Sequence, residues 1–181
     1  MNGPTDLTSV VERYVPSGDE RSHRIAIDAL ETGRPMWPRS EFVPGHFTAS
    51  GFVLRPDRTA LLLIHHGKLD RWLQPGGHFE VEDETVEVGA RREVAEETGL
   101  SQIRRMGSSL VRIDAHPIPE RGDEPEHIHI DLAMGFIADS DEIGPIDEVL
   151  DARWVPFDQL DAYDTDDAVK RGVATLRSMI G

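Results

Sequence analysis

Residues 77–100 read GHFEVEDETVEVGARREVAEETGL, and this stretch decides how the rest of the chain is interpreted. It places Glu93, Glu96 and Glu97 within five residues, just ahead of Gly99. On a helix, positions three and four residues apart share a face, so the three carboxylates stack together. Like charges at this spacing destabilise an isolated helix by about 0.2–0.5 kcal/mol per pair. A divalent cation with oxygen ligands compensates such repulsion, and the alternative is a solvated acidic face.

The same stretch resembles the Nudix box, the signature of the Nudix hydrolase family. The residues that match it with the family's spacing are Glu84, Arg92, Glu93, Val94, Glu96, Glu97, Gly99 and Leu100. Six residues separate Gly77 from Glu84 where the family pattern has five, so the loop before the helix is one residue longer. Counting from Gly77 nominates Asp83 instead. We take the register anchored on the helix, because an insertion is absorbed more easily in a loop than in a helix.

The resemblance implies a pyrophosphohydrolase that cleaves a nucleoside diphosphate linked to another moiety, with Mg²⁺ or Mn²⁺ as cofactor. A diphosphate repels a nucleophile, and divalent ions neutralise its charge and acidify a bound water. By resemblance, Glu93 and Glu97 ligate the metal, and Glu96 binds a further metal ion or a metal-bound water. The alternatives are a binding or regulatory module that has lost hydrolysis, and an isoprenoid diphosphate isomerase. The isomerase family relies on a cysteine, which this chain lacks.

Two further groups complete the expected site. By resemblance, Arg92 is expected to hold Glu84 or a neighbour through a two-pronged contact, and Glu96, Arg92 and Glu84 are the catalytic residues that the resemblance implies. The backbone of Gly76 or Gly77 is expected to approach the metal and offer a carbonyl oxygen, with Gly76 as the expected ligand. A simple tight turn is the alternative explanation of the two glycines.

Outside the box, four side chains are candidates for substrate binding. Lys68 and Arg71 precede the Gly-Gly turn, close in sequence to the expected phosphate site, and plain surface charge is the alternative. His127 and His129 share a strand face with Asp131, so they either line the substrate site or face solvent. His-x-His-x-Asp also suggests zinc, although one face of one strand rarely supplies a whole site. The resemblance implies that a loop glutamate beyond the box acts as catalytic base, and the sequence leaves four open: Glu124, Glu126, Glu142 and Glu148.

Secondary structure is predicted along the rest of the chain from periodicity and turn residues. Helices are expected at residues 5–33, 85–99, 157–162 and 166–179, and strands at 47–54, 60–64, 71–74, 108–115, 127–137 and 152–155. Within 127–137, five apolar residues alternate strictly with other residues, which predicts one core face and one wetter face.

Strands on both sides of a central helix favour an α+β fold over regular βαβ alternation. The resemblance implies, more specifically, a Nudix-like α/β/α sandwich with a mixed central sheet. We therefore divide the chain into an N-terminal helical extension and connector, residues 1–43, and a Nudix hydrolase domain, residues 44–181.

The N-terminal extension carries apolar residues that need a partner. Ile25, Ala29 and Leu30 fall on one helical face, and Trp37 and Phe42 follow in the connector. A free tail would leave these groups in water, so we expect them to pack on the same subunit or on a twofold-related copy. A homodimer is therefore one expected arrangement.

Composition restricts the class of protein and its partners. The 181 residues include 19 basic and 34 acidic ones, which gives a net charge of −15. Binding to a nucleic-acid backbone depends on cationic side chains, so we do not expect it. The sequence has no apolar run long enough for a membrane span, no signal-peptide pattern and no cysteine. We expect a cytoplasmic enzyme whose partner is a small-molecule diphosphate.

Overall fold

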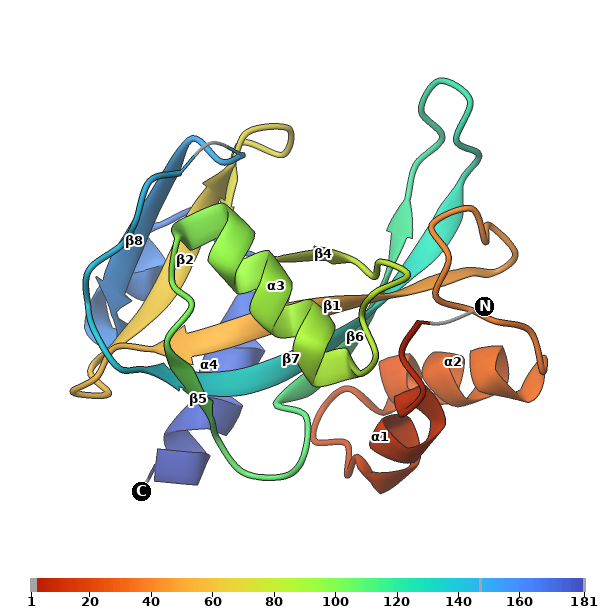
Figure 1. The fold of residues 1–181 in the computed structure, drawn as a ribbon, viewed down its shortest axis with the longest axis horizontal. Coiled ribbons are helices and arrows are strands. Elements are labelled where there is room, and N and C mark those ends of the chain that lie inside the picture. The colour runs from red at the N-terminus through yellow and green to blue at the C-terminus, as the bar shows by residue number, and fades with distance from the viewer. Residues whose placement is uncertain (1–2, 147, 181) are drawn as a thin grey trace.

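The structure, a computed structural model, describes residues 3–146 and 148–180. Within these residues, helices cover both faces of an eight-stranded mixed sheet (Figure 1). In chain order the elements are α1 (Leu7–Arg13), α2 (Glu20–Glu31), β1 (Gly45–Leu54), β2 (Ala60–His66), β3 (Arg71–Leu73), β4 (Gly76–His78), α3 (Val86–Thr98), β5 (Ile103–Arg105), β6 (Arg112–Ile118), β7 (His127–Ala138), β8 (Asp151–Pro156), the 3-10 helix η1 (Phe157–Ala162) and α4 (Asp167–Ile180). The predicted α+β class is confirmed.

Strands β1 and β7 form the centre of the sheet. They run parallel, from Gly45 opposite Ile128 to Leu54 opposite Ile137. The other pairs are antiparallel: β2 and β4 lie against β1, β3 and β8 against β2, and β5 and β6 against β7. A parallel pair needs a long connection, and here the connection includes α3. This helix contacts β1, β4 and β7.

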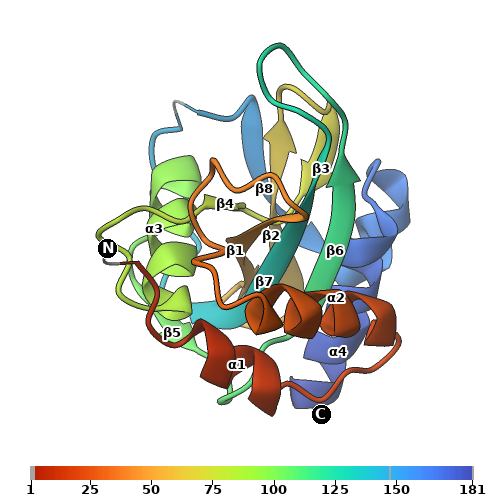
Figure 2. The ribbon, with the colours of Figure 1, turned by 90° about the vertical axis from the view of Figure 1, so that its right-hand side faces the viewer.

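Side chains that alternate along β1 enter two separate cores. Phe47, Ala49 and Val53 pack with the apolar residues of α1, α2 and α3. Phe52 and Leu54 pack on the other face, with the apolar residues of α4. Figure 2 shows α3 and α4 on opposite sides of the sheet. The expected α/β/α sandwich with a mixed sheet is therefore confirmed.

Helix α3 has the ends that its sequence predicts. The Thr85 hydroxyl accepts a hydrogen bond of 3.2 Å from the Val88 amide, which caps the N-terminus. Gly99 ends the helix with φ at 69°, and its amide donates to the Ala95 carbonyl. The buried apolar residues of the helix are Val86, Ala90 and Val94.

The N-terminal extension is built into the start of α3. The Thr5 amide donates to the Glu84 carbonyl at 3.0 Å, and Oδ1 of Asp6 accepts from the Val86 amide at 2.9 Å. Apolar residues of the extension that pack on the core include Ile25, Ala29, Leu30 and Trp37. Packing on the same subunit, one of the two expected arrangements, is thus observed.

Four elements differ from the prediction. The helix expected at residues 5–33 is two helices, because Pro16 and Gly18 interrupt it. The strand expected at 108–115 begins at Arg112, after a bend at Gly107, whose φ is 62°. Strands β4 and β5 have three residues each, too few to show a period. Among the described residues, no helix combines the length and apolar character needed to cross a membrane.

The expected wetter face of β7 is wrong for most of the strand. Asp131 and Ala133 on that face are buried. At Gly135 a Cβ would lie 3.4 Å from the Leu176 side chain, because α4 covers this part of the sheet. On this face, only the start of the strand carries the expected histidines, His127 and His129.

Candidate active site

The acidic residues of α3 differ in their exposure. Glu93 and Glu97 are only 9% and 7% exposed, whereas Glu96 lies on the surface. The Gly76 amide donates a hydrogen bond of 2.9 Å to Oε2 of Glu97. The backbone of β4 therefore runs beside the two buried carboxylates.

Gly77 is the point of closest approach between β4 and Glu93. A Cβ on Gly77 would lie 2.7 Å from both carboxylate oxygens of Glu93, closer than real Cβ atoms come. At Gly76 a Cβ would lie 2.4 Å from the Ser50 Cβ on β1. Only glycine leaves room for this approach of backbone to carboxylate. The two glycines therefore do more than form a tight turn.

Arg92 ties the loop, β4 and the helix together. Its Nε and Nη2 donate to the two carboxylate oxygens of Asp83 at 3.2 and 2.9 Å. Nη2 also donates to the His78 carbonyl at 2.7 Å. Nη1 donates to Glu93 at 3.0 Å and to Glu96 at 2.7 Å. One guanidinium thus fixes the positions of two of the clustered carboxylates.

Arg92 contacts a neighbour of Glu84, which is one of the two partners expected for it. Its partner is Asp83, which is 1% exposed and also accepts from the Glu80 amide at 2.8 Å. Glu84, the other partner expected for Arg92, is exposed. The count from Gly77 is therefore the one that reaches the arginine's partner. The additional residue lies between Asp83 and the start of α3, where the chain is not yet helical.

Burial makes the two carboxylates costly to ionise. It raises the pKa of Glu93 to about 7 and that of Glu97 to about 8, because a charged carboxylate loses hydration there. The charges of Glu96 and Glu148 raise both values further, while Arg92 opposes the shift at Glu93. A divalent cation favours the ionised forms, and oxygen donors suit Mg²⁺ or Mn²⁺. The residues present therefore fit such an ion.

Glu148 stands out among the four loop glutamates left open by the sequence. Its charge acts on both buried carboxylates of α3, so it lies on the same side of the molecule. The neighbouring Leu150 amide donates to the His65 carbonyl at 3.0 Å, which anchors this segment to β2. Glu124, by contrast, pairs with Arg39 at 2.7 Å.

The two basic candidates for substrate binding have different surroundings. Lys68 is exposed in the turn between β2 and β3. In that turn, Gly67 lies against the Leu150 side chain, so the turn borders the segment that carries the loop glutamate just described. Arg71 is paired with Asp164 at 3.1 Å. Its guanidinium is already engaged by the segment that precedes α4.

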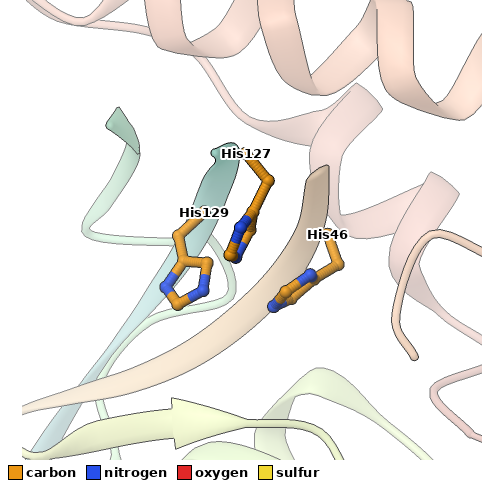
Figure 3. Close-up of side chains that lie close together, drawn as sticks. All are labelled: His46, His127 and His129. Atoms are coloured by element: carbon orange, nitrogen blue, oxygen red, sulfur yellow. The ribbon is translucent and has the colours of Figure 1, made fainter. Parts of the chain in front are cut away.

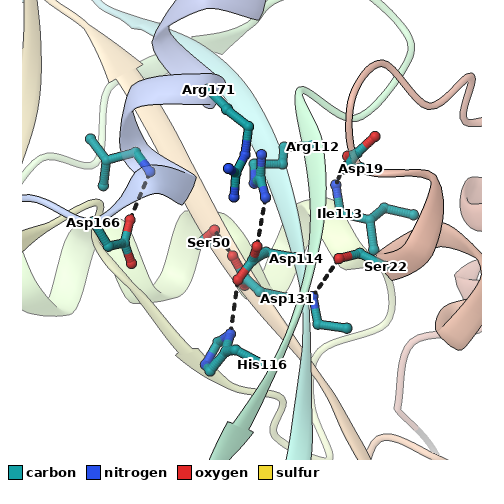
Figure 4. A network of polar contacts seen from close by, with 12 residues as sticks. Asp19, Ser22, Ser50, Arg112, Ile113, Asp114, His116, Asp131, Asp166 and Arg171 are labelled. Atoms are coloured by element: carbon teal, nitrogen blue, oxygen red, sulfur yellow. Dashed lines mark hydrogen bonds and ion pairs between the residues drawn. The ribbon is translucent and has the colours of Figure 1, made fainter.

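A polar network lies on the α4 side of the sheet (Figure 4). Asp131 of β7 is buried, which raises its pKa, and it accepts hydrogen bonds from Ser50 at 2.5 Å and Thr48 at 3.2 Å. Gln74, just before β4, donates to the same carboxylate at 3.4 Å. These residues, with Asp114 of β6, are called the polar face below.

Asp114 lies directly opposite Asp131 in the β6–β7 register, but its pKa is shifted in the opposite direction. Although burial alone raises it, contacts with His116 at 3.0 Å and Arg112 at 2.6 Å lower the pKa of Asp114 to about 2. Two neighbouring carboxyl groups are thereby driven toward opposite protonation states. Sequence reasoning missed this pair, because it depends on which strands become neighbours.

His127 and His129, the other two substrate-binding candidates, border the polar face. His46 of β1 lies opposite His129 in the register, and their ring centroids are 4.7 Å apart. His78 of β4 also contacts His129, at 5.0 Å. Burial lowers the pKa of His78 to about 4 and that of His129 to about 2, so both rings are neutral at pH 7. The sequence singled out neither His46 nor His78.

Fold and site together define an α/β/α sandwich in which one helix presents buried carboxylates to a Gly-Gly strand. The family model described as NUDIX domain matches residues 45–176. Solved structures share the fold. A NUDIX-family hydrolase from Clostridium perfringens is 24% identical, with 74% of this chain and 95% of that chain covered and a TM-score of 0.54. The chain belongs to the Nudix hydrolase family.

Two other solved structures share the fold, and one of them holds a nucleotide-sugar ligand. The NUDIX domain of Shewanella oneidensis NrtR, in complex with ADP-ribose, is 17% identical, with 86% of this chain and 98% of that chain covered and a TM-score of 0.55. A C. elegans Ap4A hydrolase in a binary complex is 13% identical, with 74% and 96% covered and a TM-score of 0.51. At these identities the likeness concerns the fold.

Proposed function

We propose that this protein is a divalent-cation-dependent pyrophosphohydrolase that cleaves a diphosphate linkage in a nucleoside diphosphate joined to another moiety. The observation that carries the proposal is the buried pair Glu93 and Glu97, whose raised pKa values mark a site that favours a cation. Membership of the Nudix hydrolase family supports the class of reaction.

Residues from α3 and β4 would hold the cation. Glu93 and Glu97 offer buried carboxylates, Glu96 offers an exposed one at the same end of the helix, and the Gly76 carbonyl is the backbone candidate. When bound, Mg²⁺ or Mn²⁺ supplies charge neutralisation for the diphosphate and lowers the pKa of a water molecule. Arg92 orients the carboxylates through the contacts described above.

Glu148 is our candidate for the general base. In the reaction a water oxygen bonds to phosphorus, the bridging P–O bond breaks, and the water's proton passes to a base. Glu148 is exposed, and its charge acts on the carboxylates of Glu93 and Glu97. Its position in a loop outside the helix leaves it free of the contacts that hold Glu93 and Glu96 to Arg92.

The polar face and the relatives both favour a substrate that contains a nucleoside. Gln74, Asp131 and His129 offer neutral or polar groups beside β4, where they would contact the nucleoside part of a ligand. The NrtR domain binds ADP-ribose, and the C. elegans protein is an Ap4A hydrolase. Both ligands join adenosine to a chain of phosphates, so they are the first substrates to test.

A turnover assay with metal control tests the proposal. Purified protein is incubated with ADP-ribose or Ap4A in Mg²⁺, in Mn²⁺ or in EDTA, and nucleotide products are separated by chromatography. We expect turnover only with a cation. Glu97→Gln should lower kcat by about 10³-fold, since metal stabilisation of charge contributes several kcal/mol. Glu82→Gln, an exposed loop change, is the matched control. Ligand binding without turnover in any metal would instead indicate a binding or regulatory module.

A further inference from the structure

Histidines gather at one end of the central strands. The chain has eight histidines, and the rings of five of them lie in contact with one another. The members of this histidine cluster are His46, His78, His116, His127 and His129. Centroid separations in the cluster run from 4.7 to 5.8 Å. The cluster uses strands β1, β4, β6 and β7, so it exists only in the folded sheet.

Strand register explains why three of these rings converge. His127 and His129 are two apart on β7, so both point to one face of the sheet. His46 lies beside them because β1 runs parallel to β7 with His46 opposite His129. Figure 3 shows the three rings close together between the two strands. Strands β1 and β7 together therefore supply three neighbouring imidazoles, which one face of a single strand does not.

Two of the three rings have a fixed tautomer. Nδ1 of His46 lies 2.9 Å from the Glu41 carbonyl, and Nδ1 of His127 lies 2.7 Å from the Pro125 carbonyl. A carbonyl oxygen only accepts, so each Nδ1 carries the proton. In the neutral ring, Nε2 then has a free lone pair. Donation of one ring N–H to a backbone carbonyl is the usual arrangement around metal-binding histidines.

Nε2 of His46 is an acceptor that nothing in the described part of the chain uses. Its Nε2 is fully buried and has no hydrogen-bond partner among the residues that the structure describes. A buried polar atom without a partner costs about 1–3 kcal/mol, so a ligand there has a clear energetic basis. The atom belongs to the same cluster in which His127 presents its own Nε2.

We propose that His46, His127 and His129 form a binding site for a divalent transition metal ion of the Zn²⁺ type. One ring nitrogen of each lies within 4.8 Å of those of the other two. Around tetrahedral zinc with bonds near 2.1 Å, ligand nitrogens lie about 3.4 Å apart. Binding would draw the three nitrogens from within 4.8 Å of one another to about that spacing. Three nitrogen donors leave a fourth position for water or an exogenous ligand.

This site differs in chemistry from the carboxylate site of α3. Imidazole nitrogen suits Zn²⁺, Cu²⁺ and Ni²⁺, whereas carboxylate and carbonyl oxygens suit Mg²⁺ and Mn²⁺. Strand β4 lies between the two sites. Gly77 faces Glu93, and the next residue, His78, turns its ring toward His46 and His129. Metal binding by the three histidines is therefore independent of the proposed hydrolysis.

Cobalt spectroscopy tests the site in the full-length protein. Metal-stripped protein is titrated with Co²⁺ in excess Mg²⁺, which occupies the oxygen site. Co²⁺ on imidazole nitrogens with low coordination number gives intense visible absorption, whereas Co²⁺ on oxygen ligands absorbs weakly. We expect one intense site per chain that Zn²⁺ displaces. Absence of such absorption and of Zn²⁺ binding by calorimetry would overturn the proposal.

Variants separate this site from other metal binding. His127→Gln and His129→Gln should each weaken Zn²⁺ binding by more than the about 10–100-fold that loss of an outer-shell partner costs. His66→Gln, outside the cluster, should bind as the parent does, and so should Glu97→Gln. Equal loss in His66→Gln, or loss in Glu97→Gln, would place the ion elsewhere.

A spectrum of the parent protein covers the case in which a variant fails to fold. In ¹H–¹⁵N spectra of the imidazoles, Zn²⁺ should shift the ligand nitrogens of His46, His127 and His129. The rings of His23 and His65 lie outside the cluster and should not shift. Shifts confined to those two rings, or shared by every histidine, would contradict the site.

Discussion

Arg92 and Asp83 face each other across the loop before α3, with Nε 3.2 Å from Oδ1 and Nη2 2.9 Å from Oδ2. This two-pronged contact is stronger than a single hydrogen bond and fixes the angle between the groups. The same Nη2 contacts the His78 carbonyl at 2.7 Å. The Arg92–Asp83 ion pair, with the contact to His78, thus links the loop, strand β4 and helix α3.

Replacing Asp83 should distinguish the two possible loop registers, in which either Asp83 or Glu84 is the functional partner of Arg92. Asp83→Asn removes the carboxylate that holds Nε and Nη2 of Arg92 and leaves the guanidinium bound only to Glu93, Glu96 and the His78 carbonyl, so we expect kcat to fall by about 10–100-fold. Glu84→Gln alters an exposed side chain and should retain most of the activity. Steady-state kinetics on both variants measure this. A larger loss in Glu84→Gln would restore the register anchored on the helix.

The geometry of Arg92 matters beyond its charge. Lysine keeps the charge but loses the planar fork that reaches Asp83, His78 and the glutamates together. We expect Arg92→Lys to remain folded by circular dichroism and to lose activity by about 10–100-fold. Parent-like kinetics in this variant would mean that the fork has no role in orienting the site.

Without a cation, the protein should lose stability as pH rises. The pKa of Glu93 is raised to about 7 and that of Glu97 to about 8 by burial, above about 4.3 in an unfolded chain. Between these values the unfolded chain binds fewer protons than the folded protein does. The free energy of unfolding therefore falls with pH, by at most about 1.4 kcal/mol per pH unit for each group.

Urea unfolding in EDTA at several pH values measures this dependence. Glu97→Gln has one fewer group to ionise, so its stability should fall less steeply between about pH 5 and pH 8 than that of the parent. Saturating Mg²⁺ should recover stability in the parent at the upper end. Identical slopes for parent and Glu97→Gln would show that this carboxyl ionises normally in the folded protein.

Any side chain at residue 77 should weaken cation binding. The Cβ of Gly77→Ala would lie 2.7 Å from the Glu93 oxygens, so the carboxylate must move. Gly135→Ala is a matched control, since its Cβ would lie 2.9 Å from Val111, away from the site. We expect both variants to melt earlier and only Gly77→Ala to bind Mn²⁺ more weakly by calorimetry. Equal Mn²⁺ affinity in the two variants would contradict this role.

The N-terminal extension should stabilise the carboxylate helix. Asp6 caps the Val86 amide, and loss of such a cap in Asp6→Ala costs about 1 kcal/mol. Glu12→Ala, an exposed change on α1, should stay within about 0.5 kcal/mol of the parent. Deleting residues 1–33 should lower the melting temperature far more, and light scattering will show whether the oligomeric mass changes. Unchanged stability and mass would make the extension dispensable.

The sequence predicts α3 well because its signals are local. Thr85 and Gly99 mark its ends, and the period of its apolar residues identifies its buried face. Strand β4 is too short to show a period, and its position depends on pairing with β1. The partnership of His46 with His129 likewise depends on pairing between distant strands. Local sequence patterns do not specify such pairings. They also do not specify which loop glutamate lies near the carboxylates of α3.

The three residues of β4 contact groups on both faces of the sheet. The Gly76 amide binds Glu97, the His78 carbonyl binds Arg92, and the His78 ring lies among the other imidazoles. A ligand that shifts His78 therefore acts on the backbone to which both charged residues are bound. Thermodynamic reciprocity then applies: whatever factor an occupant of one face adds to affinity at the other face is returned in full. Any such coupling could therefore be measured from either face, as the effect of one ligand on the affinity for the other.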